Sequence, residues 1–476
     1  MLAASPSRDA LSRGADGLLK AGFAVLLLVL LAFIWVAPLF LLAFPALLVG
    51  VGLAWYASRS SLHILAFMLL AFGGIMNKSE GISVFEVAFA GAFFIYMPGW
   101  LLSQVLLYRE RMVNTRTDGA LAFFLLYSLF GIGLGWMLGG KVSWIAGEWL
   151  ALIMLFFYFP VKEQVAHRPQ ALPVILSILG LLAAIAVVRN IWEYQYELNA
   201  ASYVWEVKQG RATVNEHWLM MAGLAALACY LHAQKRWLRW SLLVFFAAMV
   251  AGVIVGQSRA VWVSFLLGTQ VLFVLVRPAQ RRTMLTVGSV SAITALGVGY
   301  AVLGDFFFVV LVGLIERFVS LSTATTQDLS LVNRFIENMA VLDRIKDSPI
   351  IGHGFGVPIK YFSLVFEFTR EQSFIHNAYL SVWYKHGLIG LVAIYGFYIS
   401  TIVKGWRLAR TASSPTARLG GMIVAACFIA EALSAITQNS FAGDDTCLLI
   451  GVGGGIVAGL ARRAQGMDKP SPTRVS

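Results

Sequence analysis

Apolar runs long enough to cross a bilayer recur along this chain and limit what it can fold into. A transmembrane helix needs about 20 apolar residues. We count fourteen runs of suitable length, near 21–36, 38–57, 62–77, 82–107, 118–139, 143–160, 171–190, 216–233, 238–256, 260–276, 284–304, 378–402, 419–438 and 443–461. The first two are divided at Pro38, and a kinked or re-entrant segment there would lower the count. Because backbone polar groups in lipid must bond to one another, the runs predict an all-α polytopic membrane protein with about 12–14 transmembrane helices.

The composition supports lipid as the main solvent. Of the 476 residues, 59% are hydrophobic and 13% are charged, and the mean hydropathy is +0.78. A soluble domain carries about 25% charged residues. These values exclude a cytosolic enzyme, a disordered tail protein and a secreted disulfide scaffold. The three cysteines, Cys229, Cys427 and Cys447, all lie in apolar runs and are too few for a disulfide framework.

The net charge of +12 is an orientation signal, and nucleic-acid binding is not needed to explain it. If the N-terminus is cytoplasmic and the runs alternate, the cytoplasmic segments hold 23 of the 36 basic residues and six of the 24 acidic residues. Cytoplasmic loops carry such an excess of Lys and Arg. We therefore expect both termini in the cytoplasm. The first run lacks a convincing cleavage site, so we interpret it as a retained signal anchor.

One connection on the predicted outer face is much longer than the others. About seventy residues, 305–375, separate a transmembrane region at 1–304 from a C-terminal transmembrane region at 376–476. Loops of this length are usually functional or disordered. Helical periodicity over 306–320 and 330–348 argues against disorder and predicts a helical periplasmic loop.

The second of these predicted helices has a clear start, end and apolar face. Ser330 is the expected N-cap, and Pro349 follows the end. The expected apolar stripe consists of Phe335, Met339, Leu342 and Ile345. The pattern predicts an amphipathic helix that either rests on the membrane surface or covers a site as a lid.

Two arginines on the outer face are candidates for a phosphate site. Arg259 lies in a tight turn between two apolar runs, where the inside-positive bias does not explain it. It either snorkels to the headgroups or presents a fixed guanidinium to phosphate. Arg334 either pairs with Glu337 at i,i+3 or belongs to the same site.

His376 begins the run that follows the long loop, at the expected wet end of a helix. It is either a structural residue or a general base, because histidine exchanges protons near neutral pH. His217 and His353 are also on the outer face but lack neighbouring arginines in the sequence.

Other polar residues in or near the runs have competing interpretations. Three carboxylates within runs either line a polar cavity or pair with Arg189 or Lys141; they are Glu86, Glu148 and Glu431. We interpret the Gly-His-Gly-Phe-Gly segment at 352–356 as a turn and not as a nucleotide loop. His217 with Glu216, and His376 with Asp444 and Asp445, do not have the spacing of a known metal site, so we expect no metal.

Three motifs in this order resemble the O-antigen ligase and O-antigen polymerase superfamily of bacterial envelope glycosyltransferases. They are Gly-Gln-Ser-Arg ending at Arg259, Asn333-Arg334 opening a helix that leads into 347–356, and His-Asn-Ala-Tyr-Leu beginning at His376. The likeness covers about 250–390 well. A fourth element, 210–215, is similar to an outer-loop motif of many members but lacks its usual Gly and Pro, which weakens any role for Arg211.

The resemblance implies a GT-C-like, metal-independent and inverting glycosyltransferase that needs no cofactor. It would work at the periplasmic face of the bacterial inner membrane, moving a glycan from undecaprenyl pyrophosphate to lipid A–core. Arg259, Arg334 and, less firmly, Arg211 would bind the pyrophosphate. His376 would be the general base, with Asn377 and Tyr379 supporting it.

Of the activities that the resemblance allows, we favour O-antigen ligase. The alternatives within the superfamily are O-antigen polymerase and protein O-oligosaccharyltransferase. The alternative from another class is a transporter of solutes or lipid-linked glycans, which would place charges near the bilayer midplane and repeat its helices in two halves.

Overall fold

The computed structural model describes residues 61–75, 84–107, 111–200, 203, 212, 215–304, 307–309, 311–313, 315–316, 329–364 and 367–466. The chain divides into two compact units, 1–127 and 128–476. The first unit contains α3 (Ser61–Ile75), α4 (Val84–Leu102), the π-helical η3 (Ser103–Leu107) and the beginning of α5 (Arg116–Met137). The ring of Phe72 in α3 meets that of Phe89 in α4 edge to face, with centroids 5.7 Å apart.

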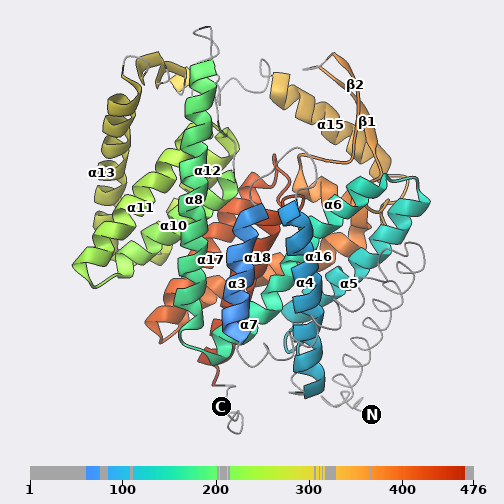
Figure 1. Cartoon of the computed structure of the whole chain (residues 1–476), viewed down its shortest axis with the longest axis horizontal. Helices are drawn as coiled ribbons and strands as arrows, with labels where there is room; N and C mark the ends of the chain where they lie inside the picture. Colours follow the sequence, from blue (N-terminus) through green and yellow to red (C-terminus); the bar gives the residue numbers. More distant parts are fainter. Residues whose placement is uncertain are drawn as a thin grey trace, which may run out of the picture. The chain divides into compact units, whose positions relative to one another are not determined.

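The second unit holds most of the helices and all the strands among the described residues (Figure 1). After the last turns of α5 come α6 (Val142–Ile153), η4 (Met154–Phe157), α7 (Tyr158–His167), α8 (Ala171–Ala200), α10 (Glu216–His232), α11 (Arg236–Val255), α12 (Arg259–Leu275) and α13 (Pro278–Leu303). Then follow α15 (Leu329–Ile345), β1 (Ile359–Ser363), β2 (Phe368–Gln372), α16 (Ala378–Thr411), α17 (Pro415–Ser434) and α18 (Asp444–Ala464).

The predicted apolar runs from 62–77 onward each coincide with a helix or a continuous series of helices. Eight helices in the described part of the chain are long and apolar enough to cross a membrane. They are Ala88–Leu106, Arg116–Met137, Val142–His167, Ala171–Ala200, Arg236–Val255, Ala378–Thr411, Pro415–Ser434 and Asp444–Ala464. The runs 21–36 and 38–57 lie outside the described residues. The polytopic, helical membrane architecture is confirmed, and the total of 12–14 spans stays a prediction.

The core of the second unit lies where α16, α17 and α18 pack together and α18 meets α7 (Figure 1). Both α17 and α18 have 67% of their most apolar window buried, whereas α11 has 22%. Small residues allow such close packing. A Cβ added at Gly455 of α18 would lie 2.6 Å from the Tyr158 carbonyl oxygen, so no larger side chain fits there.

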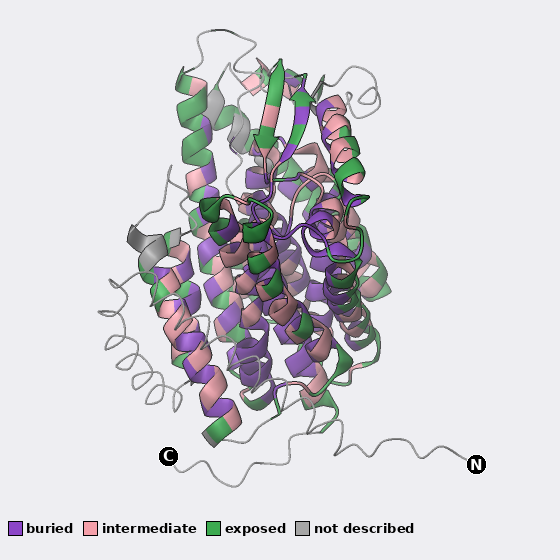
Figure 2. Ribbon diagram, turned by 90° about the vertical axis from the view of Figure 1, so that its right-hand side faces the viewer, coloured by how far each residue is buried: buried purple, intermediate pink, exposed green. Residues whose placement is uncertain are grey.

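The 305–375 segment differs from the entirely helical loop that we predicted. Strands β1 and β2 form an antiparallel hairpin, with Ile359 opposite Gln372 and Ser363 opposite Phe368. Alternate residues of β1 are buried, whereas most of β2 is exposed (Figure 2). This period of two reflects packing on one face of the hairpin. Of the helix predicted at 306–320, the described residues 307–309, 311–313 and 315–316 are helical.

Helix α15 exists as predicted, but its start and its buried face are different. It begins at Leu329, so Ser330 lies inside the helix and is not its N-cap. The side chains of Phe335 and Met339 are 65% and 47% exposed. The buried positions are spaced four apart, and they are Asn333, Glu337, Val341 and Ile345.

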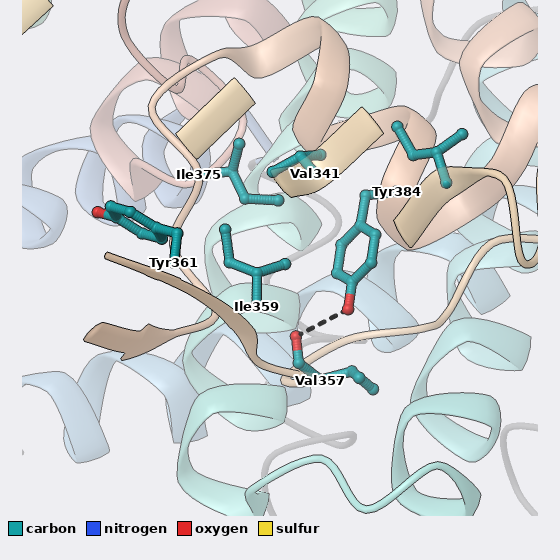
Figure 3. Close-up of a cluster of buried hydrophobic side chains, with 7 residues drawn as sticks. Val341, Val357, Ile359, Tyr361, Ile375 and Tyr384 are labelled. Atoms are coloured by element: carbon teal, nitrogen blue, oxygen red, sulfur yellow. Dashed lines mark hydrogen bonds between the residues drawn. The ribbon is translucent and has the colours of Figure 1, made fainter. Parts of the chain in front are cut away.

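A hydrophobic cluster explains this rotation of α15 (Figure 3). Val341 and Ile345 pack with residues of β1, the segment before α16 and α16 itself; these are Val357, Ile359, Tyr361, Ile375 and Tyr384. The Tyr384 hydroxyl donates to the Val357 carbonyl oxygen at 3.5 Å. The cluster therefore attaches α15 and the hairpin to the beginning of α16.

The glycine-rich segment 352–356 is a turn, as predicted, and it fixes the long loop to the helices. Gly354 has a φ of +79°, and its N–H donates to the Lys385 carbonyl oxygen at 2.9 Å. A Cβ at this position would lie 2.2 Å from the Gly135 nitrogen in the last turn of α5. Gly387, with φ of 60°, interrupts α16 where the turn contacts it. Only glycine fits both backbone angle and space.

Candidate active site

The structure pairs His376 with a carboxylate from a different part of the chain. His376 Nδ1 lies 2.8 Å from Glu337 Oε2, and the His376 backbone N–H donates to Glu337 Oε1 at 2.7 Å. Among the described residues, His376 Nε2 has no hydrogen-bond partner. The His376 side chain is 31% exposed, whereas that of Glu337 is completely buried. The carboxylate thus fixes the imidazole ring, and the Nε2 atom of the ring remains available to a substrate.

Glu337 is held in place by further donors from the hairpin. Its Oε2 accepts hydrogen bonds from the Tyr361 hydroxyl at 3.1 Å and from Gln372 Nε2 at 3.2 Å. Burial, followed by the nearby Glu337 carboxylate, raises the pKa of Tyr361 to about 12, so the hydroxyl remains a donor. A buried carboxylate is stable only when hydrogen bonds satisfy it. The hairpin and the start of α16 together provide them.

The loop between α17 and α18, residues 435–443, brings the three predicted motifs together. Three consecutive residues of this loop contact them: Thr437 accepts from Arg334, Gln438 donates to Ser258, and Asn439 donates to the backbone next to His376. Arg334 Nη1 lies 2.9 Å from the Thr437 carbonyl oxygen. Gln438 Nε2 lies 2.9 Å from Ser258 Oγ, and Asn439 Nδ2 lies 2.8 Å from the Ile375 carbonyl oxygen.

Of the two arginines of the predicted phosphate site, Arg259 occupies a helix position suited to an anion. Arg259 is the first residue of α12, directly after the N-cap Ser258. Arg334 lies on α15, one turn before Glu337. Both are partly exposed. A helix N-terminus carries a partial positive charge that adds to the guanidinium of Arg259. Glu337 is not a surface partner of Arg334, because its carboxylate is buried and pairs with His376.

The remaining predicted site residues have structural roles at the start of α16. Asn377 is the N-cap, and its Oδ1 accepts from the Leu380 N–H at 3.0 Å. Tyr379 donates its hydroxyl to the Ala432 carbonyl oxygen at 2.7 Å. Both hold the start of α16, directly after His376. Arg211 lies outside the described residues.

A second histidine–carboxylate pair, which we did not predict, is linked through Gln438 to Ser258, the residue before Arg259. His217 Nδ1 lies 2.8 Å from Oε2 of Glu431, which is completely buried. His217 Nε2 contacts Gln438 Oε1, so Gln438 connects this pair to Ser258. Glu431 also accepts from the Ser440 hydroxyl. Of our two alternatives for Glu431, the one in which it pairs with Arg189 or Lys141 is therefore wrong.

Glu148 has a different partner from those that we considered. It forms an ion pair with Lys385 of α16 at 2.8 Å, and both side chains are largely buried. Its Oε2 accepts from the Gly356 N–H at 2.9 Å. Lys141 instead approaches Glu371 of the hairpin at 3.8 Å. Glu148 thus strengthens the attachment of the glycine turn. The side chain of Glu86 lies outside the described part of the chain.

His376 and Asp445, which we considered together as metal ligands, have other hydrogen-bond partners. His376 is on Glu337, while Asp445 Oδ2 accepts from Asn215 Nδ2 at 2.8 Å. In the part of the chain that the structure describes, no group of three or more His, Cys, Asp or Glu side chains is arranged to hold a metal ion.

The arrangement can remove a proton from a hydroxyl group next to an anion. When Nδ1 of a neutral imidazole donates to a carboxylate, its Nε2 carries a lone pair and can accept a proton. The buried carboxylate then stabilises the imidazolium that forms. Arginines nearby can bind a leaving phosphate group by charge-assisted hydrogen bonds. The 435–443 loop contacts both the backbone beside the proton acceptor His376 and the arginine motifs, and α15 carries both Glu337 and Arg334.

Comparison with known proteins identifies the segment that carries these groups. Residues 244–395 match the family model described as O-antigen ligase. The matched range begins in α11, ends in α16 and includes Arg259, Arg334, Glu337 and His376. No curated protein matches the chain. The resemblance to the O-antigen ligase and polymerase superfamily is therefore confirmed.

Proposed function

We propose that this membrane protein, whose residues 244–395 match the O-antigen ligase family model, is an O-antigen ligase. It transfers a glycan from undecaprenyl pyrophosphate to a sugar hydroxyl of lipid A–core. In this proposal, the site faces the periplasm, the protein resides in the bacterial inner membrane and both termini are cytoplasmic. The charge distribution supports this orientation.

The observation that carries the proposal is the buried Glu337 carboxylate on His376 Nδ1. An acceptor hydroxyl is a poor nucleophile, and a positioned base accelerates its attack by about 10²–10⁴-fold. His376 Nε2 takes the hydroxyl proton while the acceptor oxygen bonds to the anomeric carbon of the donor. The bond from that carbon to the pyrophosphate oxygen breaks at the same time, and the configuration is inverted.

The leaving undecaprenyl pyrophosphate takes the bonding electrons and needs stabilisation of its negative charge. Arg259 and Arg334 supply this by fixed guanidinium groups, which act strongly in a site shielded from water. Glu337 acts through His376 as a positioning residue. It keeps the proton on Nδ1 and stabilises the imidazolium after proton transfer.

The experiment that tests this activity is the lipopolysaccharide pattern of a deletion strain, with and without the gene restored on a plasmid. We expect loss of all capped core bands and their recovery with the wild-type gene. Core carrying a single repeat would instead identify a polymerase. An unchanged pattern would overturn transfer to or within lipopolysaccharide.

A further inference from the structure

A basic cavity lies at the ends of the helices opposite to the candidate active site. Helices α10 and α12 begin near the site, with His217 and Arg259, and end at this cavity. Helix α16 likewise begins beside His376 and ends here, whereas α17 begins here and ends at the 435–443 loop. The cavity has a volume of about 690 Å³.

The lining of this cavity is rich in cations and contains no acidic residue. Three arginines, Arg277, Arg410 and Arg418, contribute to it together with His232 and the amides of Gln234 and Gln280. Among the described residues, none of the three guanidinium groups has a carboxylate within ion-pair distance. The Arg410 guanidinium lies over the ring of Trp406, 5.6 Å from its centroid. Converging arginines without a counterion favour an anionic ligand.

A second, apolar cavity adjoins the basic one. It has a volume of about 890 Å³ and lies among α8, α10, α11, α17 and α18. Its lining is mainly Leu, Ile, Phe, Ala and Gly, and it shares His232, Gln234 and Leu419 with the basic cavity. A hydrocarbon chain attached to a headgroup in the basic cavity can therefore pass the shared residues into the apolar cavity.

We propose that the two cavities together bind one anionic phospholipid of the surrounding membrane. The phosphate of its headgroup contacts Arg277, Arg410 and Arg418, and an acyl chain occupies the apolar cavity. The charge of the lining matches the headgroup, and the adjoining apolar volume matches the chain. A free phosphate ion would use only the first cavity.

Membrane topology alone does not account for this arrangement. The inside-positive bias explains why arginines occur in the connections 277–282 and 404–418, which we predict to be cytoplasmic. It depends on the number of basic residues in a loop and does not require three of them to line one cavity. The cytoplasmic leaflet of a membrane also supplies the anionic lipids that such a cavity would bind.

The test compares three probes on the purified, detergent-solubilised full chain: phosphatidylglycerol, phosphatidylcholine and inorganic phosphate. Binding is measured by native mass spectrometry and by the shift in melting temperature. We expect phosphatidylglycerol to bind at least tenfold more tightly than phosphatidylcholine. Equal affinities for the two lipids would overturn the proposal.

Two kinds of variant test the headgroup contact and the acyl-chain contact separately. The triple variant Arg277→Gln, Arg410→Gln, Arg418→Gln should weaken phosphatidylglycerol binding at least tenfold, and single Arg418→Gln serves if the triple variant does not fold. Arg407→Gln, on the same end of α16 but outside the lining, should change binding by less than twofold. Unchanged affinity in the arginine variants would contradict the headgroup contact.

Ala225→Phe fills the apolar cavity and should weaken phosphatidylglycerol binding several-fold, while inorganic phosphate binds as before. If Ala225→Phe leaves lipid binding unchanged, the acyl-chain contact is wrong and the basic cavity is a site for free anions.

Discussion

Replacement of Glu337 by Gln tests the candidate active site with the smallest change in shape. The carboxylate accepts from His376 Nδ1 at 2.8 Å and from the His376 backbone N–H at 2.7 Å, through different oxygens. A glutamine side chain has one oxygen and one NH₂ group. In either orientation, its NH₂ therefore faces one of these two positions on His376.

Both orientations damage the site in ways that can be estimated. If the NH₂ group faces Nδ1, it donates to that nitrogen, and the ring proton moves to Nε2, where no base remains. If it faces the backbone N–H, two donors meet in a completely buried position, at a cost of about 1–3 kcal/mol. We expect transfer to fall by about 10²–10⁴-fold, the contribution of a general base. This corresponds to about 3–5 kcal/mol in activation free energy.

The assay is steady-state transfer by the purified protein from lipid-linked glycan to lipid A–core. Glu371→Gln is the matched control, because that carboxylate lies on the hairpin, is 41% exposed and approaches Lys360 at 3.5 Å. Surface pairs of this kind contribute about 0–1 kcal/mol, so its activity should be unchanged.

A double variant distinguishes positioning from an independent role. Because Glu337 acts through His376, Glu337→Gln added to His376→Ala should cause no further loss, as expected for residues that act as a unit. Transfer by Glu337→Gln within threefold of the wild-type rate, with normal accumulation in the membrane, would exclude Glu337 as a positioning residue for His376.

Three other predictions concern Arg259, the Glu148–Lys385 pair and His353. Arg259→Lys keeps the charge but loses the planar fork, so transfer should fall by about 10–100-fold in the same assay; an unchanged rate would remove Arg259 from the phosphate site. Lys385→Met leaves the Glu148 carboxylate buried without the partner that lies 2.8 Å away. The free energy of unfolding, measured by urea titration, should therefore fall by about 3–5 kcal/mol. A fall of less than about 1 kcal/mol would contradict this. Burial lowers the pKa of His353 below its ordinary value of 6.5, so the unfolded chain binds the proton first and stability should fall as pH drops below about 6.5. The melting temperature of His353→Phe, which retains an aromatic ring against Tyr384, should depend less on pH over this range; an equal dependence would exclude His353 as the cause.

The helices were predictable because hydrophobicity in lipid is a local property of the sequence. Each apolar run from 62–77 onward forms helix with boundaries close to those expected. The orientation of α15 was not predictable in this way. Its apolar stripe suggested that Phe335 and Met339 face the protein, yet Glu337 and Val341 are buried instead. Their partners come from the hairpin and from α16, whose positions the periodicity of one helix cannot indicate.

The site was predictable only in part, for a similar reason. Arg259, Arg334 and His376 stand out because they disobey the inside-positive rule or belong to recognisable motifs. Glu337 does not, because a carboxylate three residues from an arginine usually forms a surface pair. The polar residues Thr-Gln-Asn at 437–439 come where the apolar run 419–438 ends, and they were the available signal for the loop that joins the motifs. The Glu148–Lys385 pair depends on tertiary contacts alone.

Glycan transfer by the reconstituted protein carrying His376→Ala is the decisive measurement for the assignment of the base. We expect this variant to bind the lipid-linked donor as the wild type does, since the arginines are intact, but to transfer the glycan at least 10²-fold more slowly. Transfer at the wild-type rate would contradict the assignment of His376 as the base, and with it the role given to Glu337.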